Sequence, residues 1–306
     1  MKKLTFFIAM LMFFSSALFA QVGINSDNSA PDASAGLDVK FNNKGFRPPR
    51  MTTTQMYAIS SPAAGLMVYN TTLNSICWFN GSSWDIGTKR DGKDCGTLTY
   101  GGQTYTSVII GMQCWMAQNL NIGVAIPGSQ YQTNNATIEK YCYNNDAANC
   151  NVYGGLYQWA EMVQYLNGAT NLTSWNPVPT GNVQGICPTG WHLPTDAEWT
   201  ILTTYLGGES VAGGPMKGLG YWLAPNIGAT NSSGFTALPG GGRNDPVIYP
   251  IYFDNLTITG RFWSASEYLT ASGAWYRNMY YNSAMVLRNG YSDGKLQGFS
   301  ARCLQD

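Results

Sequence analysis

Charged residues are scarce in this 306-residue chain: Asp, Glu, Lys and Arg make up 11% of it, under half of the roughly 25% of an average soluble protein. Basic and acidic residues number 17 each, and no cluster of Lys or Arg occurs. Nonspecific binding to nucleic acid depends on Lys and Arg neutralising phosphates. We therefore expect no nucleic-acid partner.

Histidine is nearly absent, and His192 is the one present. The sequence also lacks Gly-x-Ser-x-Gly, His-Glu-x-x-His and Walker-type motifs. A Ser-His-Asp triad would have to use His192, but this residue lies in an aromatic block before a helix cap, which favours a packed, hydrogen-bonded role. We predict no enzyme activity and no cofactor. The alternative is a polysaccharide-acting hydrolase, which needs only two carboxylates, and the candidates for them are Glu161, Asp196, Glu198, Asp245, Asp254, Glu267 and Asp293.

Long apolar runs are absent after the first twenty residues. Lys2 and Lys3 precede an apolar stretch over residues 4–14, and Ala17-Leu18-Phe19-Ala20 matches the A-x-A cleavage pattern. We predict a signal peptide over residues 1–20, cleaved after Ala20, and a secreted chain in the periplasm, at the cell surface or outside the cell. Later windows fall short of the roughly twenty apolar residues of a membrane span, so none is expected in the mature chain.

Cys-x-x-Cys pairs, which are typical of zinc sites, are also missing, and we predict no metal site. In an oxidising compartment the seven cysteines are first of all disulfide candidates. Six cysteines can pair in fifteen ways, although the short spacing of Cys142 and Cys150 favours that pair. One cysteine must stay unpaired, and Cys77 is the candidate because it lies in a different segment from the others.

The chain divides into an N-terminal and a C-terminal part at a charged run. Residues 21–88 hold short alternating runs, which predict a β-rich module with one short helix after Thr52 that ends at Ser61-Pro62. Residues 89–94 contain five charges in six positions, typical of a solvated linker. Residues 95–306 are long enough for one sizeable core.

Residues 95–306 are predicted to form an α+β domain with two main helices. Thr195 and Glu198 form a capping box, which predicts a helix over residues 194–206 before Gly207-Gly208. Apolar residues spaced three or four apart predict a second helix over 156–166. Residues 262–264, 274–276 and 299–303 are typical of core strands.

Four ordered motifs in this part resemble the Fibrobacter succinogenes major paralogous domain family. They are Ile-Gly-Met-Gln-Cys-Trp-Met-Ala-Gln-Asn-Leu-Asn at 110–121, Cys-Pro-Thr-Gly-Trp-His-Leu-Pro-Thr-Asp-Ala-Glu-Trp at 187–199, Gly-Phe-Thr-Ala-Leu-Pro-Gly-Gly at 234–241 and Gly-Phe-Ser-Ala-Arg-Cys-Leu at 298–304. The resemblance implies a C-type-lectin-like, strand-rich fold with disulfide staples. It implies the disulfides Cys187–Cys303, Cys95–Cys114 and Cys142–Cys150.

The first part resembles a repeat of exported Bacteroidota proteins and parts of phage tail fibres. The similarity covers Gly-Leu-Asp-Val at 36–39, the segments at 44–52 and 65–70, and the aromatic residues from Trp78 to Trp84. It implies an attachment or stalk module through which the chain could form a homo-oligomer.

Residues 243–292 combine aromatic rings with Asn and Asp, as sugar-binding surfaces do. The binding residues that we predict are Arg243, Asn244, Asp245, Tyr249, Tyr252, Asp254 and Tyr280. Of these, Tyr249, Tyr252 and Tyr280 are expected to be exposed, whereas Trp263 is expected in the core. Asp245 and Asp254 with neighbouring Asn residues could supply calcium ligands, but the Glu-Pro-Asn or Gln-Pro-Asp tripeptide of calcium-dependent lectins is missing.

These observations together predict a secreted, non-enzymatic surface or extracellular protein that binds a glycan or a protein. A hydrolase acting on polysaccharide is the first alternative, and a structural subunit of an extracellular fibre is the second.

Overall fold

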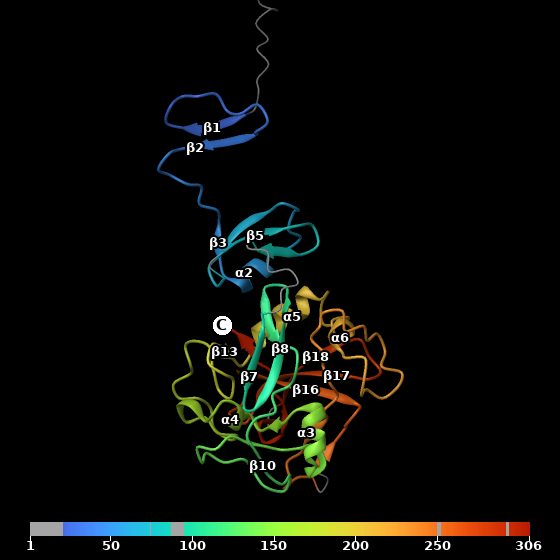
Figure 1. The fold of residues 1–306 in the computed structure, drawn as a ribbon. Coiled ribbons are helices and arrows are strands. Elements are labelled where there is room, and N and C mark those ends of the chain that lie inside the picture. Colours follow the sequence, from blue (N-terminus) through green and yellow to red (C-terminus); the bar gives the residue numbers. More distant parts are fainter. Residues whose placement is uncertain (1–20, 74, 87–94, 250–251, 292–293) are drawn as a thin grey trace, which may run out of the picture. The chain divides into compact units, whose positions relative to one another are not determined.

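The computed structural model of the chain describes residues 21–73, 75–86, 95–249, 252–291 and 294–306. It divides into two compact units, Met1–Pro49 and Arg50–Asp306 (Figure 1). The predicted signal peptide, residues 1–20, and the predicted linker, residues 89–94, lie outside the described residues. Both therefore stay predictions, as does the domain boundary placed at the linker.

The first unit contains a two-stranded parallel sheet of β1 (Val22–Asn25) and β2 (Leu37–Lys40). The connecting loop covers one face of this sheet, where Pro31 packs so closely on Gly23 that a Cβ there would lie 3.0 Å from the proline ring. On the opposite face, the pairing of the two strands places four exposed apolar side chains side by side, which are Val22, Ile24, Leu37 and Val39.

The second unit begins with a four-stranded sheet in the order β3-β4-β5-β6. Its strands are β3 (Arg50–Met51), β4 (Met67–Asn70), β5 (Ser75–Phe79) and β6 (Trp84–Ile86). The short helix predicted after Thr52 is confirmed as α2 (Thr53–Tyr57), which begins with a capping box between Thr52 and Gln55. It ends at Tyr57, before the predicted end at Ser61-Pro62. Cys77 is buried in this small core as a free thiol, as predicted.

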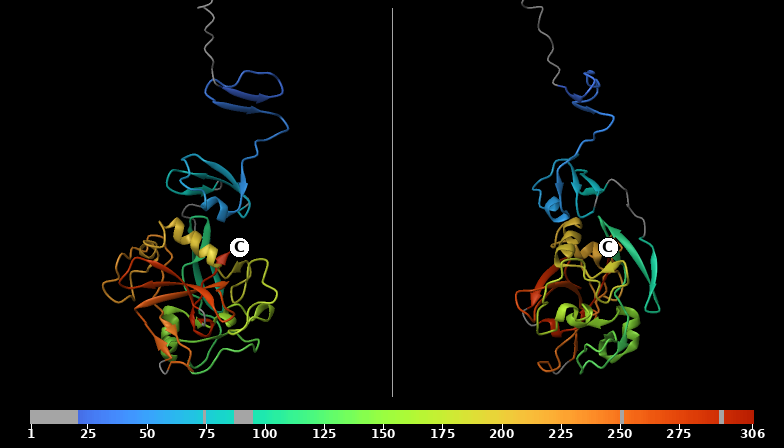
Figure 2. Two further views of the ribbon diagram at one scale, coloured as in Figure 1. Left: turned by 180° about the vertical axis from the view of Figure 1, so that it is seen from behind. Right: turned by 90° about the vertical axis from the view of Figure 1, so that its left-hand side faces the viewer.

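The rest of the second unit, drawn from two sides in Figure 2, contains two five-stranded sheets. Their strand orders are β13-β20-β9-β8-β7 and β12-β19-β16-β17-β18. The strands of the first are β7 (Thr97–Tyr100), β8 (Gln103–Ile110), β9 (Gln113–Met116), β13 (Trp191–His192) and β20 (Leu304–Gln305). Those of the second are β12 (Leu156–Tyr157), β16 (Thr259–Glu267), β17 (Ala274–Tyr280), β18 (Val286–Tyr291) and β19 (Phe299–Ser300). Smaller pairs are β10 (Val124–Ala125) with β11 (Glu139–Lys140), and β14 (Gly242–Arg243) with β15 (Phe253–Asp254). The predicted core strands 262–264 and 274–276 are confirmed, and 299–303 is a strand over its first two residues.

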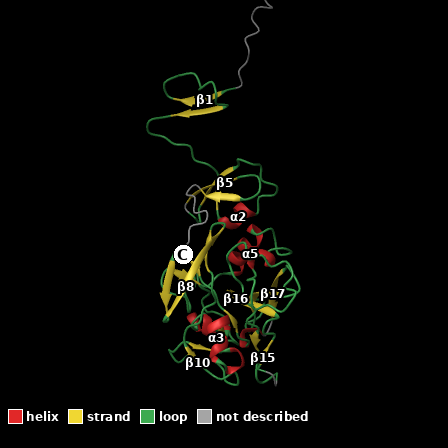
Figure 3. Cartoon of the chain, turned by 45° about the vertical axis from the view of Figure 1, so that its right-hand side comes forward, coloured by secondary structure: helices red, strands yellow, loops and turns green. Residues whose placement is uncertain are grey.

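The helices are few and short, so that much of the unit is loop (Figure 3). The helix predicted over 194–206 is confirmed as α5 (Asp196–Tyr205), with the expected capping box. The helix predicted over 156–166 is wrong: Leu156 and Tyr157 pair with β19, and only α4 (Trp159–Met162) is helical. Sheet pairing there overrides the apolar periodicity. Instead, α3 (Ala147–Tyr153) is the second main helix, capped by Asp146.

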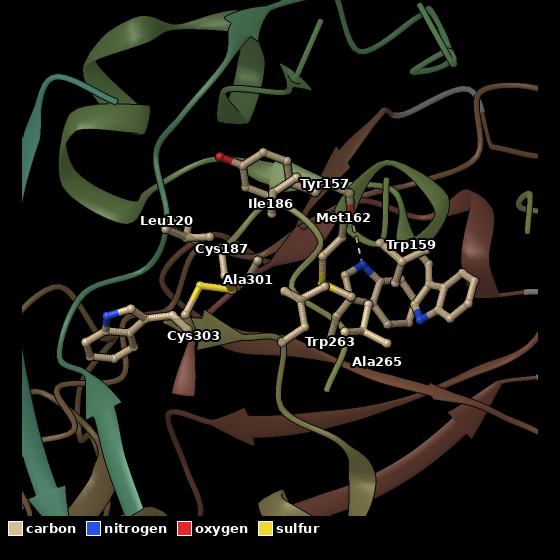
Figure 4. Packing of buried hydrophobic residues seen from close by; sticks show 14 of the residues in the cluster. Leu120, Tyr157, Trp159, Met162, Ile186, Cys187, Trp263, Ala265, Ala301 and Cys303 are labelled. Carbon is tan, nitrogen blue, oxygen red and sulfur yellow. Dashed lines mark hydrogen bonds between the residues drawn. A yellow bond between two sulfur atoms is a disulfide. The ribbon is translucent and has the colours of Figure 1, made fainter. Parts of the chain in front are cut away.

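The largest core cluster surrounds the disulfide Cys187–Cys303 (Figure 4). Trp263 is buried there, as predicted, and its indole N–H donates to the backbone oxygen of Tyr157 at 2.8 Å. The pairs Cys95–Cys114 and Cys142–Cys150 are also present, so the three implied disulfides are confirmed. Strands, helices and disulfides together define an α+β fold. In the described part of the chain, no helix has the length and apolarity to span a membrane.

Candidate functional site

A long irregular connection joins α5 to β16. We call residues 207–258 the long loop, which is coloured yellow to orange in Figure 1. Its regular structure, in the part described, is limited to the single-turn α6 (Gly213–Met216) and the two-residue strands β14 and β15. Connections of this length within a compact domain are uncommon and are usually functional. The long loop is therefore the strongest candidate for a binding surface.

Lys217 anchors the first half of the long loop from inside. Its side chain is fully buried, and Nζ donates to the backbone oxygens of Ile227, Tyr280 and Ser283 at 2.9, 3.1 and 2.9 Å. These three bonds use every N–H of the ammonium. Burial lowers the pKa of Lys217 to about 8, so the charged form still predominates at neutral pH.

Arg243 anchors the second half in the same way. The guanidinium is fully buried and lies 4.6 Å from the ring centre of Tyr141. It donates to the backbone oxygens of Gly128, Leu296 and Gln130 at 2.8–2.9 Å. Arg243 was predicted as a ligand-binding residue. The structure corrects this, because its side chain is enclosed and spends its donors on the backbone.

Arg302 holds the middle of the long loop from the C-terminal segment. It is fully buried and stacks 4.0 Å from the ring centre of Phe235. Its guanidinium donates hydrogen bonds to the backbone oxygens of Met116, Phe235 and Thr236 and to Oδ1 of Asn119. Three buried cations thus tie the long loop to other segments through backbone oxygens, some of which belong to the loop and some to its neighbours.

The tip of the long loop projects large apolar side chains outward. The carboxylate of Asp245 is buried and accepts from the Tyr131 hydroxyl at 2.6 Å and from the backbone N–H of Val247 at 3.0 Å. The turn that follows exposes Val247 by 80% and Ile248 by 63%. Tyr249, in the same turn, is also exposed. We call residues 247–249 together with the exposed Tyr252 the tip.

A second exposed stretch lies in residues 217–227, which we call the Lys217 loop. Its exposed side chains are Leu219, Tyr221, Leu223 and Ile227. Trp222 is buried between them and donates its indole N–H to the backbone oxygen of Ala237 at 3.0 Å. Tyr221 has a φ of 69°, in the left-handed region that side chains rarely adopt. A rare backbone conformation persists only where its surroundings fix it.

The exposed surface of the long loop is almost without charge. The sequence has no charged residue over 218–242. Lys217, Arg243 and Asp245 are buried, and Glu209 is half-buried. Asp254 is neutralised by Arg261, whose Nη1 lies 2.9 Å from its carboxylate. Such a surface can stack on rings, bury apolar groups and form neutral hydrogen bonds, but it offers little electrostatic attraction.

The remaining predicted binding residues fall in different environments. Tyr249 and Tyr252 are exposed, as expected. Tyr280 was also expected to be exposed, but its side chain is half-buried, so this prediction is wrong. Asn244 is half-buried and its backbone N–H donates to the oxygen of Tyr252 at 2.7 Å, which closes the base of the tip. Asp254 is half-buried beside Arg261. Within the described residues, no group of three or more His, Cys, Asp or Glu side chains is placed to hold a metal ion.

The carboxylates considered for a hydrolase also have partners. Asp196 pairs with Arg277 and Arg288, and Glu267 pairs with Lys295 at 2.5 Å. Burial raises the pKa of Glu161, whose carboxylate accepts from the backbone N–H of Glu139. Asp293 lies outside the described residues. Each described candidate therefore has a structural contact, and the absence of enzyme activity stays a prediction.

His192 is held between two carboxylates, as a packed and hydrogen-bonded residue. Nε2 lies 3.0 Å from Glu198 and Nδ1 lies 2.7 Å from Asp306. These groups border a cavity of about 330 Å³ that is also lined by Gln113 and Asn182. Burial opposes protonation of His192, but the hydrogen bonds and charges of the two carboxylates outweigh it and raise the pKa of the imidazole.

We call His192 with its two carboxylate partners, Glu198 and Asp306, the clamp. The clamp should make the free energy of unfolding depend on pH. Because the folded-state pKa of His192 is above its unfolded value of about 6.5, its contribution is complete below that pH and is lost as the pH rises through the folded pKa. The free energy of unfolding in urea should therefore fall from about pH 6 upward. His192→Gln should lower stability at pH 6 and flatten this slope. Parallel pH profiles for the two proteins would contradict the clamp.

The described residues thus define a disulfide-bonded α+β domain with a long loop anchored by buried cations. Residues 108–305, well over half of the chain, match the model of the Fibrobacter succinogenes major domain, and the chain belongs to this family. Residues 23–99 are similar to the phage tail like trimerisation region. No curated protein and no solved structure showed a significant match.

Proposed function

We propose that the chain is a secreted, non-enzymatic binding protein whose long loop recognises a glycan or a protein outside the cell. The observation that carries this proposal is the tip, where apolar side chains up to 80% exposed stand on a loop anchored by buried hydrogen bonds. Exposed apolar patches on an ordered support mark interaction sites. A rigid support also limits the entropy that binding must remove.

Three further findings support this function. The three disulfides are typical of an oxidising, extracytoplasmic compartment, and the family suggests an extracellular or surface protein. The bridge from Cys187, shortly before α5, to Cys303, near the last strand, fits the C-type-lectin-like fold that the motifs imply. In that fold we assign the long loop as the recognition surface.

The uncharged surface of the long loop favours an uncharged ligand. Charged groups at an interface mainly accelerate association and make it sensitive to salt. Because the long loop carries one half-buried carboxylate, Glu209, and its other charges are buried or paired, the affinity should change little between low and high salt. A strongly salt-dependent affinity would place the binding surface elsewhere on the molecule.

The tip is tested by alanine variants. Once a glycan array and capture on candidate proteins have supplied a ligand, Tyr249→Ala and Tyr252→Ala should each weaken binding by roughly 1–2 kcal/mol in calorimetry, because exposed tyrosines bury large areas at low entropic cost. Their melting temperatures should stay close to that of the wild type. Leu269→Ala is the matched control, since Leu269 is an exposed apolar residue outside the long loop.

Three outcomes separate the proposal from its alternatives. Wild-type affinity in both tyrosine variants would remove the tip as the binding surface, and unfolding of both would make these residues core. Turnover of a polysaccharide that is abolished by alanine at an acidic residue, while binding survives, would establish the hydrolase instead.

We also propose that the chain forms a homotrimer through the first unit, in line with the similarity of residues 23–99 to a trimerisation region. An isolated pair of strands is marginally stable in water, and the face formed by Val22, Ile24, Leu37 and Val39 has no cover within the described unit. Copies of the same face would bury these side chains against one another. Several binding loops would then act together and increase avidity.

Sedimentation velocity of the secreted protein tests the trimer. The wild type should sediment as a trimer at micromolar concentration, and the double variant Ile24→Lys, Leu37→Lys should sediment as a monomer whose C-terminal domain still melts normally. Lys40→Ser, which alters the same strand outside the apolar face, should leave the trimer intact. A monomeric wild type would refute trimer formation, and open-ended polymers would favour the fibre subunit.

A further inference from the structure

The ammonium of Lys217 lies where three backbone oxygens converge. One of them belongs to Ile227 in the long loop, and the other two belong to Tyr280 and Ser283 at the turn between β17 and β18. Converging carbonyl oxygens are the ligands that proteins use for hard cations. The site is therefore a cation site that the chain fills with its own side chain.

We propose that Lys217 is a positioning residue that acts as the built-in cation of the long loop, so that the Lys217 loop is held in its binding conformation without a metal ion. This role adds a structural basis to the proposed function. Only the measurement of ligand affinity rests on that function. The ordering of the loop by Lys217 stands on the contacts alone.

The contacts show how one ammonium closes this loop. Lys217 lies at the beginning of the loop and binds the oxygen of Ile227 at its end. Asn226 strengthens the closure by donating from Nδ2 to the oxygen of Gly218 at 3.1 Å. Trp222, in the middle, places its ring centre 5.3 Å from Nζ of Lys217. The two ends and the centre are thus tied together, and the exposed side chains between them are held in place.

The ligand set suits a single positive charge better than a divalent metal. Ca²⁺ takes six to eight oxygens, with carboxylates among them, whereas Nζ of Lys217 donates to three neutral carbonyls. No acidic residue occurs over 218–242. Lys295 makes a useful contrast, because it also binds backbone oxygens but is neutralised by Glu267. The three hydrogen bonds of Lys217 all go to backbone oxygens.

Chemical rescue in the full chain tests this role. Lys217→Ala should increase amide hydrogen exchange over 217–227 by about tenfold or more, because the tie between the loop ends is lost. Methylammonium, which carries three N–H donors, should restore slow exchange in this variant. Tetramethylammonium has the same charge but no N–H, so at equal concentration it should not. Lys140→Ala is the matched control, because the ammonium of Lys140 donates to Asn121, outside the long loop, and should not affect these amides.

Three measurements on the wild type keep the test decisive if Lys217→Ala fails to fold. Exchange over 217–227 and the melting temperature should be the same with EDTA and with Ca²⁺, and so should the affinity for any ligand of the tip. Faster exchange with EDTA, unchanged exchange in Lys217→Ala, or equal rescue by both ammonium ions would overturn the inference. If no ligand binds at all, the proposed function fails, whereas a failed rescue with intact binding removes only the role of Lys217.

Discussion

Replacing Cys187 and Cys303 together by serine should lower the free energy of unfolding by about 5 kcal/mol, measured by chemical denaturation of the oxidised protein. The bridge joins residues 116 positions apart, and the chain-entropy model gives a loop of this length about that stabilisation. Both cysteines also belong to the largest core cluster, which includes Trp263 and Ile186. Two buried hydroxyls there would add to the loss.

The short bridge Cys142–Cys150 provides the comparison. Its cysteines are 8 positions apart, for which the same model gives about 2.5 kcal/mol. The double serine variant at these positions should therefore stay folded under conditions that unfold the first variant. Equal losses for the two bridges, or free thiols at Cys187 and Cys303 in correctly exported protein, would contradict the assigned fold.

Arg302→Met should cost at least about 3 kcal/mol, because it leaves several buried oxygens without a donor, each worth roughly 1–3 kcal/mol. The orphaned groups include the backbone oxygens of Phe235 and Thr236 in the long loop and Oδ1 of Asn119. Methionine fills much of the same volume, so the loss measures the hydrogen bonds more than a cavity. Urea titration followed by tryptophan fluorescence gives the value.

Arg288→Met is the control for this variant. Arg288 pairs with Asp196 at the surface, and its side chain is 40% exposed, so its loss should cost no more than about 1 kcal/mol. Asp196 keeps its second partner, Arg277, in this variant. Similar losses for Arg302→Met and Arg288→Met would show that the buried cations do not hold the long loop.

Local sequence signals predicted the elements that local interactions determine. The capping boxes at Thr52 and Thr195 specify where α2 and α5 begin, because both partners lie within four residues of each other. The helix expected over 156–166 failed because Leu156 and Tyr157 pair with strand residues over a hundred positions later. A pairing of that range leaves no local trace in the sequence. The disulfide pattern came from the family motifs, since counting cysteines leaves fifteen pairings open.

The candidate site was predicted only in outline. Residues 243–292 included two exposed tyrosines of the tip, but Arg243 proved to be an internal anchor, and the Lys217 loop was missed. One signal could have indicated the anchors: Lys217 and Arg302 are isolated basic residues within apolar, charge-free stretches of a chain that is poor in charge. A lone cation in such surroundings has few exposed partners and is a candidate for burial. Which oxygens it collects depends on the folded loops.

Amide hydrogen exchange of the wild-type long loop tests most directly whether this loop is an anchored platform that presents an exposed tip. We expect slow exchange, comparable with that of β16 and β17, at Leu223, Arg243 and Thr257. Their backbone N–H groups donate at 2.8–3.0 Å to distant residues of the loop or, for Arg243, to Gly298. Uniformly fast exchange throughout residues 207–258 would contradict the account.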